Sequence, residues 1–393
     1  MDIKKNILDI IPEVIRIRRE FHAHPELSGK EVETNRRICR YLDECGIEYK
    51  SGYAGYGVVG IIRGGEEGKT VGIRADIDAL PICENNDFEY KSVNEGVMHA
   101  CGHDAHTAIL LGTAMILKGM EHYLKGNVKL FFQPQEEAIG GAEQMIKEGC
   151  LDNPKTDHVI GLHVMPNIAT GKVELRYGKL NGNTGEVKII VRGKSGHAAY
   201  PDTAVDAIVI ASQVITALQT VVSRNVSPLN PVVLTIGKIN GGNRNNVIAK
   251  EVVLSGTLRT LDRQTRNKAK ELIKKISENV ALGLGGNAEV YFEDGYIELI
   301  NDDNVMKIVE ETAVEVVGKE NIVYKEYPSL GGEDFSYFAD KVPSAFFHIG
   351  CGNEALKTTA PLHSDKFALD EDCLKVGIEM EVRTVLKLLG NII

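Results

Sequence analysis

The chain begins with apolar residues repeating at helical spacing. Residues 1–20 carry apolar side chains among charged ones, at a period close to the α-helical repeat. These positions are Ile7, Ile10, Ile11, Val14 and Ile15. The pattern predicts an amphipathic helix rather than a signal sequence, which would hold an uninterrupted apolar stretch. A similar pattern predicts a second helix over residues 31–44.

Between residues 57 and 163, apolar runs typical of strands alternate with helical patterns. The predicted strands cover 57–63, 70–74, 128–133 and 158–163, and the predicted helices cover 107–118 and 141–148. The first two strands flank the glycine-rich residues 64–68, so we expect them to pair as a hairpin. The alternation that follows implies crossover connections and a largely parallel sheet.

From about residue 186 the order of elements changes. The pattern predicts a strand, a helix, two strands, a helix and a strand, at 186–192, 203–222, 232–239, 250–261, 264–282 and 288–292. A β-α-β-β-α-β order is ferredoxin-like, an antiparallel sheet backed by two helices. The remaining predictions are a helix over 303–317, a strand over 345–349 and a helix over 370–389.

We therefore expect an α/β protein in which a smaller α+β domain is inserted into a larger, mainly parallel-sheet domain. The candidate metal-binding residues described below stop before the ferredoxin-like segment and resume after it. The predicted boundaries are 1–183 and 295–393 for the larger domain and 184–294 for the inserted one. At 393 residues with 43% apolar content, the chain is long enough for two cores.

Charge and cysteine usage narrow the function classes. The net charge of -10 arises from interspersed acidic and basic residues, so we expect no nucleic acid or anionic membrane partner. No run approaches the ~18 consecutive apolar residues of a membrane span. The seven cysteines are odd in number and scattered, which argues against a disulfide framework and for a cytoplasmic protein.

Two glycine-rich segments match nucleotide-binding motifs but lack the context that such motifs need. Residues 55–60 fit G-x-G-x-x-G, which requires a helix to follow. The residues that follow are β-branched apart from Gly60 and predict a strand. Residues 64–70 resemble a phosphate loop with one residue too few between the outer glycines, and they also lead into a strand. A turn explains this second segment.

Cys101 and His103 are the strongest chemical signal in the chain. They lie two residues apart, just ahead of the predicted helix over 107–118, and together they offer metal ions a thiolate and an imidazole. Taken alone, a cysteine before a helix is usually a small buried residue.

Further candidate ligands follow the predicted strands. Glu136 and Glu137 come after the strand over 128–133, and His163 ends the next strand. Because the carboxyl ends of parallel strands converge, these side chains would meet Cys101 and His103. Adjacent glutamates usually lie on the solvated surface of a protein. The prediction that this pair binds metal therefore depends on the convergence of the strand ends. His363 would complete a metal centre.

Such a centre suits amide hydrolysis, which near neutral pH needs a strong oxygen nucleophile, a polarised carbonyl and a proton shuttle. Metal ions supply the first two and a carboxylate the third. One of the adjacent glutamates can bind metal while the other accepts the proton of the water. His122, His158 and His348 have no comparable support, and we expect them to be structural or at the surface.

Motifs spread over nearly the whole chain carry a family resemblance. They lie at 18–22, 25–26, 74–81, 99–104, 133–137, 193–199, 246–248, 331–335 and 361–364. In content and order they resemble the di-metal aminoacylase and carboxypeptidase metallopeptidase family, in the amidohydrolase branch of hippurate hydrolases, indoleacetyl-amino-acid hydrolases and N-acetyldiaminopimelate deacetylases. The resemblance implies a catalytic domain of the zinc-exopeptidase type and an inserted lid and dimerisation domain.

The resemblance also implies a set of metal ligands. Two divalent ions per subunit would be held by a bridging Cys101 thiolate and by His103, Glu137, His163 and His363. Glu136 would act as general base and then as acid. Thiolate ligation favours Zn²⁺, with Mn²⁺, Co²⁺ or Ni²⁺ as alternatives in this branch.

Two aspartates would support these ligands. Asp76 stands where many relatives outside this branch have a ligating histidine, and His103 would supply the missing imidazole. Asp76 and Asp78 would orient ligands or hold their loop. His22 and His106 also match the family pattern, and we assign them to scaffolding.

Three residues of the inserted domain would act on the substrate. By the resemblance, His197 would reach the active site of a partner subunit and stabilise the tetrahedral oxyanion. Asn246 and Arg259 would hold the free carboxylate of the substrate, the arginine by a charge-assisted contact. For Arg259, a cross-strand ion pair is an equally good alternative.

These observations predict a metal-dependent amidohydrolase that cleaves acetyl, benzoyl or similar N-acyl-L-amino acids, working as a homodimer or a tetramer. A dipeptidase or carboxypeptidase using the same residues is the nearest alternative. A second is an amidase with Cys101 as covalent nucleophile and His103 or His106 as base. The third, a non-catalytic binding module, would have no need of Glu136 as a base.

Overall fold

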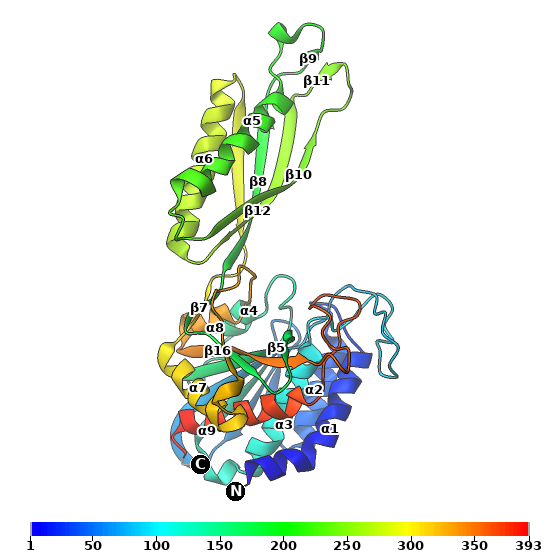
Figure 1. The fold of residues 1–393 in the computed structure, drawn as a ribbon, viewed down its shortest axis with the longest axis vertical. Coiled ribbons are helices and arrows are strands. Elements are labelled where there is room, and N and C mark those ends of the chain that lie inside the picture. Colours follow the sequence, from blue (N-terminus) through cyan, green and yellow to red (C-terminus); the bar gives the residue numbers. More distant parts are fainter. Residues whose placement is uncertain (1, 392–393) are drawn as a thin grey trace. The chain divides into compact units, whose positions relative to one another are not determined.

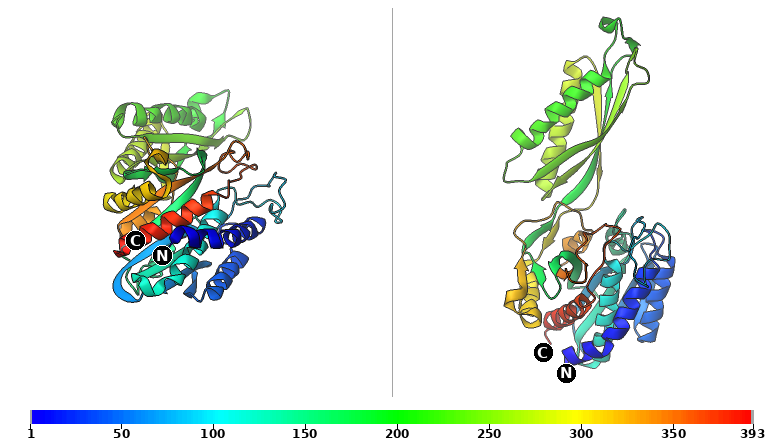
Figure 2. Two further views of the ribbon diagram at one scale, coloured as in Figure 1. Left: turned by 60° about the horizontal axis from the view of Figure 1, so that its bottom comes forward. Right: turned by 45° about the vertical axis from the view of Figure 1, so that its right-hand side comes forward.

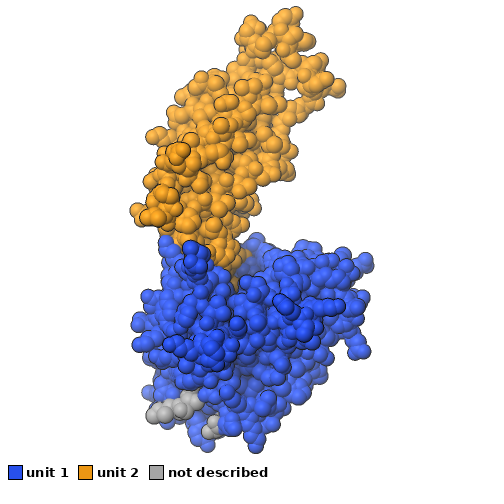
Figure 3. Space-filling view, in the orientation of Figure 1, with its two compact units in different colours: residues 1–180, 300–327, 334–393 blue, residues 181–299, 328–333 orange. Residues whose placement is uncertain are grey.

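The computed structural model describes residues 2–391 as two compact units (Figure 3). Unit 1 is formed by Met1–Leu180, Ile300–Tyr327 and Asp334–Ile393, and unit 2 by Asn181–Leu299 and Pro328–Glu333. Because unit 1 contains the chain on both sides of unit 2, the smaller unit is an insertion in the larger one.

Unit 1 is built on an eight-stranded mixed sheet (Figure 1). Its strand order is β1 (Glu48–Tyr53), β2 (Gly57–Arg63), β4 (Lys125–Gln133), β3 (Glu66–Asp76), β5 (His158–Ala169), β16 (Ser344–Gly352), β6 (Val173–Leu175) and β15 (Ile322–Tyr324). The four central strands, β4, β3, β5 and β16, are mutually parallel, whereas β1, β2 and β6 join by antiparallel pairs. The predicted mainly parallel sheet is confirmed.

The predicted hairpin between β2 and β3 is wrong. Strand β4 lies between them, antiparallel to β2 and parallel to β3. The glycines of the connection lie directly against the start of β4. A Cβ on Gly64 would come 2.1 Å from the carbonyl oxygen of Gly126, and one on Gly65 would come 2.3 Å from that of His122. These glycines therefore permit a close backbone approach rather than a hairpin turn.

Helices cover both faces of this sheet. On one face α1 (Ile3–Ala23), α3 (His103–Gly119) and α9 (Cys373–Leu389) pack together, with α2 (Val32–Glu44) and α7 (Asp303–Val317) extending the same core (Figure 1). The apolar stripe of α1 is buried there, which confirms the predicted amphipathic helix. Two short helices, α4 (Ala142–Lys147) and α8 (Ser336–Lys341), pack together, and the rings of Phe131 and Phe338 stack where α8 meets the other face.

Polar side chains gather on one face because strand residues alternate in direction. On β3, Ile73 and Ala75 belong to the core with α1, α3 and α9, so Arg74 and Asp76 point to the opposite face. On β5, Leu162 belongs to that core and His163 faces away from it. The central strands thus bring buried polar residues to the same side of the sheet.

Unit 2 contains a four-stranded antiparallel sheet with the order β10-β12-β8-β13. Along the chain its elements are β8 (Asn183–Arg192), α5 (Ala207–Thr220), β10 (Val232–Gly241), β12 (Glu251–Thr260), α6 (Arg263–Gly283) and β13 (Asn287–Asp294). Both helices lie on one face of the sheet (Figure 2). The β-α-β-β-α-β order confirms the predicted ferredoxin-like arrangement.

The remaining strands are short. In unit 2, β9 (Gly196–His197) pairs with β11 (Val247–Ile248). The others are β7 (Gly178–Asn181) and β14 (Leu299–Asn301).

Among residues 2–391, one helical segment is long and apolar enough to cross a membrane, namely Ala207–Asn225. It consists of α5 and the π-helical turn that follows. Within unit 2, Ile210, Val214 and Leu218 of this helix are buried in the core. Of the apolar window in this segment 33% is buried, so packing in the core accounts for only part of its apolar character.

Candidate metal centre

Gly102 brings Cys101 and His103 to the same site. It adopts a left-handed conformation with φ of 87° and caps the N-terminus of α3. A Cβ at this position would lie 2.3 Å from Cγ2 of Val164, so only glycine fits. The helix therefore begins at His103, four residues before the predicted start at Thr107. This early start makes His103 the first helical residue.

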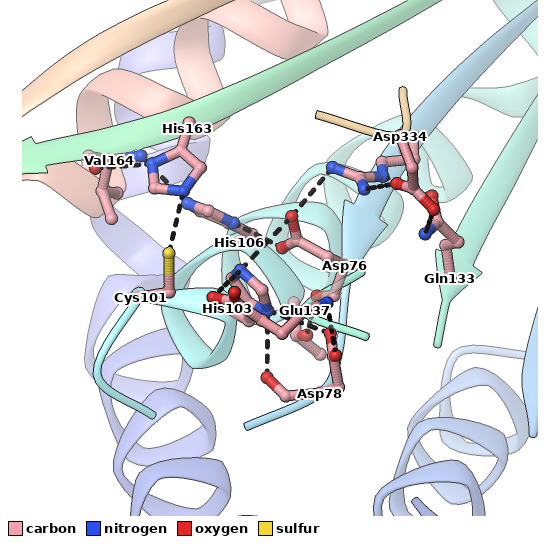
Figure 4. Close-up of polar contacts among 12 residues, drawn as sticks. Asp76, Asp78, Cys101, His103, His106, Gln133, Glu137, His163, Val164 and Asp334 are labelled. Carbon is pink, nitrogen blue, oxygen red and sulfur yellow. Dashed lines mark hydrogen bonds and ion pairs between the residues drawn. The ribbon is translucent and has the colours of Figure 1, made fainter. Parts of the chain in front are cut away.

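His163 faces Cys101 across the site (Figure 4). Its Nε2 lies 3.4 Å from Sγ of Cys101, and its Nδ1 lies 2.7 Å from the carbonyl oxygen of Val164. Because a carbonyl only accepts, Nδ1 carries the proton and Nε2 keeps its lone pair. The prediction that the strand ends at His163 is wrong, since β5 continues to Ala169.

His103 has one ring nitrogen held and one unpartnered. Its Nδ1 lies 2.9 Å from the carbonyl oxygen of Asp78 and 3.1 Å from Oδ1 of the same residue. Its buried Nε2 has no hydrogen-bond partner in the part of the chain that the structure describes. It lies 3.6 Å from Asp76 Oδ2 and 3.9 Å from Glu137 Oε1. A buried imidazole with a free lone pair among carboxylates fits a metal ligand.

The negative charge of the carboxylates around His103 also favours the binding of a cation. Burial opposes protonation of this ring, but the carboxylates of Asp76 and Asp78 outweigh it and raise its pKa well above the usual value. A divalent cation at Nε2 would satisfy the same carboxylates in place of the proton.

The glutamate pair enters the site from the end of β4. Gln135 has a φ of 66°, which turns the chain after Pro134. The backbone N–H of Glu137 donates to Oδ2 of Asp78 at 2.9 Å. The Glu136 side chain is buried, and one carboxylate oxygen of each glutamate lies within 4.8 Å of a ring nitrogen of His103.

His363 completes the site from a distant part of the sequence. Its backbone N–H donates to the carbonyl oxygen of Ala100 at 2.9 Å, which holds its loop beside Cys101. The half-exposed ring places Nε2 3.1 Å from Oε1 of Glu137. This hydrogen bond raises the pKa of His363.

Cys101 belongs to two groups of ligand atoms. It forms one with His103 and His163 and another with Glu137 and His363, and in each group the atoms lie within 4.8 Å of one another. Burial raises the pKa of the Cys101 thiol well above its usual value, whereas a coordinating cation deprotonates a thiol. The described residues therefore offer ligands for two metal ions around one sulfur.

Asp78 and Asp76 contact candidate ligand residues. Asp78 accepts from Ser28 Oγ at 2.6 Å and also contacts His103 and Glu137, so it connects two candidate ligands. Asp76 contacts His106 Nδ1 at 2.6 Å and Arg74 Nη1 at 2.8 Å. Burial disfavours a charge on Asp76, but the rings of His103 and His106 and the guanidinium of Arg74 outweigh it and hold its pKa well below the usual range.

Sequence reasoning missed a buried network beside the glutamates. Arg74 donates to Oδ1 of Asp334 and to Oε1 of Gln133, at 2.7 and 2.8 Å. Oδ2 of Asp334 accepts from the side-chain amide of Gln133 and from the backbone N–H groups of Gly141 and Ala142. Asp334 thus holds both ends of the loop that carries Glu136 and Glu137. The sequence feature that could have indicated this network is the pair of charged residues, Arg74 and Asp76, in an otherwise apolar strand.

Three other histidines have buried hydrogen-bonding partners. His348 is buried next to His163, with 6.4 Å between ring centres, and its Nδ1 lies 2.6 Å from Glu174. His22 Nδ1 lies 2.8 Å from Asp104. His106 contacts Asp76, as described above. His348 is therefore an interior residue, and the scaffolding roles predicted for His22 and His106 agree with these contacts.

In unit 2, His197 and Asn246 are neighbours, whereas Arg259 is distant from them. The backbone N–H of Ala198 donates to the carbonyl oxygen of Asn246 at 3.1 Å, and both candidate side chains are exposed. Arg259 lies near the far end of β12. The eight residue-to-residue steps from Glu251 to Arg259 span roughly 26 Å of extended chain. Within residues 2–391 Arg259 forms no ion pair. The alternative interpretation, in which Arg259 belongs to a cross-strand ion pair, is therefore not observed.

Residues 72–387 match peptidase family M20/M25/M40. Similar curated proteins include "N-acetyl-L-cysteine deacetylase" of Bacillus subtilis, 41% identical over 94% of this chain and 86% of that protein. "Thermostable carboxypeptidase 1" of Saccharolobus solfataricus is 39% identical over 95% of each chain. "N-acetyldiaminopimelate deacetylase" of Priestia megaterium is 38% identical over 94% and 96%.

Solved structures agree with this match. A structure from methicillin-resistant Staphylococcus aureus shares 38% identity with a TM-score of 0.93, covering 98% of both chains. A Bacillus subtilis protein described as a dinuclear metal binding peptidase from the M20 family shares 32% identity with a TM-score of 0.86. That match covers 98% of this chain and 99% of the other.

Proposed function

Because the chain belongs to peptidase family M20/M25/M40, we propose that it is a metal-dependent amidohydrolase that cleaves N-acyl-L-amino acids into a carboxylic acid and a free amino acid. The observation that carries this proposal is the position of Cys101 in two ligand groups, with Glu136 beside them. Relatives named as deacetylases support the substrate class.

We propose that two metal ions would be held by Cys101, His103, Glu137, His163 and His363, since Cys101 belongs to both groups of candidate ligand atoms. Divalent ions in such a site supply an activated water and polarise the carbonyl group of the substrate. A ligand set of sulfur, nitrogen and oxygen suits Zn²⁺, and Mn²⁺, Co²⁺ or Ni²⁺ are alternatives.

Glu136 handles the proton in this proposal. Its carboxylate accepts a proton from the attacking water and then donates it to the nitrogen of the leaving amine. The neighbouring Glu137 is held by Asp78 and by the ring of His363. Adjacent glutamates can therefore divide proton transfer and metal binding between them.

His197, Asn246 and Arg259 act on the substrate from unit 2. His197 would donate to the oxyanion, while Asn246 and Arg259 would bind the free carboxylate. Since Arg259 lies roughly 26 Å of strand away from the start of β12, it cannot meet His197 and Asn246 of the same chain on one small substrate. We therefore propose a homodimer in which two copies of unit 2 contribute to each site.

The outer strand β10 supports this dimer. It forms one edge of the four-stranded sheet and pairs only with β12 among the described residues. Val233 and Ile239 on this strand are 38% and 54% exposed. Unpaired strand edges with apolar side chains are suited to association with a second copy.

A carboxypeptidase or dipeptidase activity is the second candidate. The Saccharolobus relative named as a carboxypeptidase matches this chain over 95% of its length. Such an enzyme would use the same metals and Glu136, and would differ only in the group on the acyl side of the bond.

We also propose a cytoplasmic location. All seven cysteines are free in the structure, including several that are buried, as expected in a reducing compartment.

One experiment separates these functions. Purified protein is analysed for metal and assayed on acetyl-, benzoyl- and aminoacyl-amino acids, before and after chelation. We expect about two metal ions per chain, loss of hydrolysis on chelation, and recovery with Zn²⁺ or Mn²⁺. Activity that survives chelation and is abolished by thiol alkylation would instead support a Cys101 nucleophile.

A further inference from the structure

His106 connects a carboxylate on β3 to the backbone of β5. Its Nδ1 lies 2.6 Å from Oδ1 of Asp76. Its Nε2 lies 2.9 Å from the backbone nitrogen of Val164. The ring is buried, and its centre lies 4.6 Å from that of His163 (Figure 4).

These two contacts determine which ring nitrogen carries the proton. A backbone N–H only donates, so Nε2 of His106 must be the acceptor in the contact with Val164. The proton is then on Nδ1, where it is donated to Asp76. Both nitrogens are used, and the ring is held in one orientation as the neutral tautomer.

The N–H of Val164 is available because the neighbouring strand ends. The pairing of β3 with β5 stops at Arg74 and Gly161, and β3 itself ends at Asp76. Beyond that point β5 has no strand on this side, and the imidazole of His106 accepts the hydrogen bond that a strand carbonyl would otherwise accept.

The same peptide segment orients a proposed metal ligand. The carbonyl oxygen of Val164 accepts from Nδ1 of His163 at 2.7 Å, which directs Nε2 of His163 to Cys101. Val164 also packs on Gly102, between Cys101 and His103. A shift of Val164 would therefore move His163 and press on the loop that carries two further ligands.

We propose that His106 is a positioning residue for His163. Asp76 orients His106, His106 holds the N–H of Val164, and the carbonyl of Val164 orients His163 for the metal. This proposal rests on the metal centre proposed above and adds a role for a residue that otherwise belongs to the scaffold. It also gives a reason for the burial of the Asp76 carboxylate beside His106.

Two substitutions separate the contacts of His106. Glutamine places its amide oxygen as many bonds from Cα as Nε2 of histidine, so His106→Gln retains an acceptor for Val164. Asparagine places its amide at the position of Nδ1, so His106→Asn retains the donor to Asp76 and loses the acceptor for Val164. His348→Asn is the matched control, because His348 is a buried histidine beside His163 with no bond to Val164.

Metal affinity and amide exchange are the readouts. For His106→Asn we expect Co²⁺ affinity to fall about 10- to 100-fold, with an altered Co²⁺ absorption spectrum. The Val164 amide should exchange with solvent faster in this variant. His106→Gln and His348→Asn should remain close to the parent in both measurements. Equal affinity and equal Val164 exchange in all four proteins would overturn the proposal, as would equal losses in the two His106 variants.

A measurement on the unmodified protein guards against a variant that does not fold. Nitrogen NMR should show His106 as the neutral tautomer with its proton on Nδ1, and the opposite tautomer would overturn the proposal. The outcomes also distinguish the two proposals. If the parent binds no Co²⁺, the metal centre itself fails. If the parent binds Co²⁺ and hydrolyses its substrate while His106→Asn is unchanged, only the positioning role fails.

Discussion

Arg74 and Asp334 form a fully buried ion pair with 2.7 Å between Nη2 and Oδ1, although they are 260 positions apart in the sequence. Arg74 lies on β3, between the strands that carry the glutamate loop and His163. Asp334 binds the N–H groups of Gly141 and Ala142 at the end of that loop. This pair therefore connects the middle of the sheet to the glutamates.

Removing Asp334 should strongly destabilise the protein. Asp334→Ala leaves the buried Arg74 guanidinium without this carboxylate and removes the acceptor of two backbone N–H groups. Breaking a buried ion pair from one side costs about 3–5 kcal/mol. Urea unfolding measures the loss. As control, Glu33→Ala breaks the exposed pair with Arg36 and should cost less than about 1 kcal/mol. Equal small losses would show that the buried pair does not stabilise the fold.

Glu136→Gln should remove turnover without removing metal. The amide cannot accept a proton from water, and loss of a general base lowers kcat by about 10²- to 10⁴-fold. The proposed ligand Glu137 is unchanged, so metal content by atomic emission should equal that of the parent. Glu137→Gln is the comparison and should lose metal. Parent-like turnover by Glu136→Gln would contradict the assignment of the base.

His197→Ala tests the contribution of one subunit to the site of the other. We expect a lower kcat with metal content intact, because His197 would contact the transition state and not the metal. Mixing inactive Glu136→Ala and His197→Ala subunits should restore about one quarter of parental activity in a two-fold dimer, through heterodimers with one complete site. If the mixture stays inactive, His197 acts within its own chain or has no catalytic role.

Glu381 should make stability depend on pH. Its carboxyl group is buried on α9, where it accepts from the hydroxyl of Thr113 at 2.7 Å. Burial raises its pKa to about 8. The folded state holds this proton more tightly than the unfolded state. The stabilisation of the folded state by protonated Glu381 is therefore fully present below pH 4.5 and is lost as the pH rises through 8.

Glu381→Gln should remove this dependence. Between pH 5 and 9, the free energy of unfolding of the parent, measured with urea, should fall by up to about 4 kcal/mol relative to that of the variant. Glu311→Gln, at an exposed position on α7, is the control and should follow the parent at every pH. A constant difference between parent and Glu381→Gln across this range would contradict the prediction.

Local sequence patterns were sufficient for most helices and strands. The apolar stripe of α1 and the order of elements in unit 2 depend on residue spacing within each segment, and both are confirmed. Cys101 and His103 were recognisable because they are two residues apart. Motif order over the chain then indicated Glu136, Glu137 and His363, and the structure brings these residues together.

The sequence could not decide which strands are neighbours. Runs 57–63 and 70–74 with glycines between them are compatible with a hairpin, yet β4 from residues 125–133 lies between them. The same limit hid the length of β5, because only its pairing with β16 shows that the strand continues past His163.

By itself, then, the sequence determined the elements, the family and the types of residue available for metal and proton chemistry, because these depend on local spacing and on motifs. Only the tertiary structure decided that Arg74 is paired with Asp334, and that Asp76, His106, Val164 and His163 are joined by hydrogen bonds. Such contacts arise between residues from separate strands and helices, and their geometry depends on strand order and burial, which no local pattern specifies.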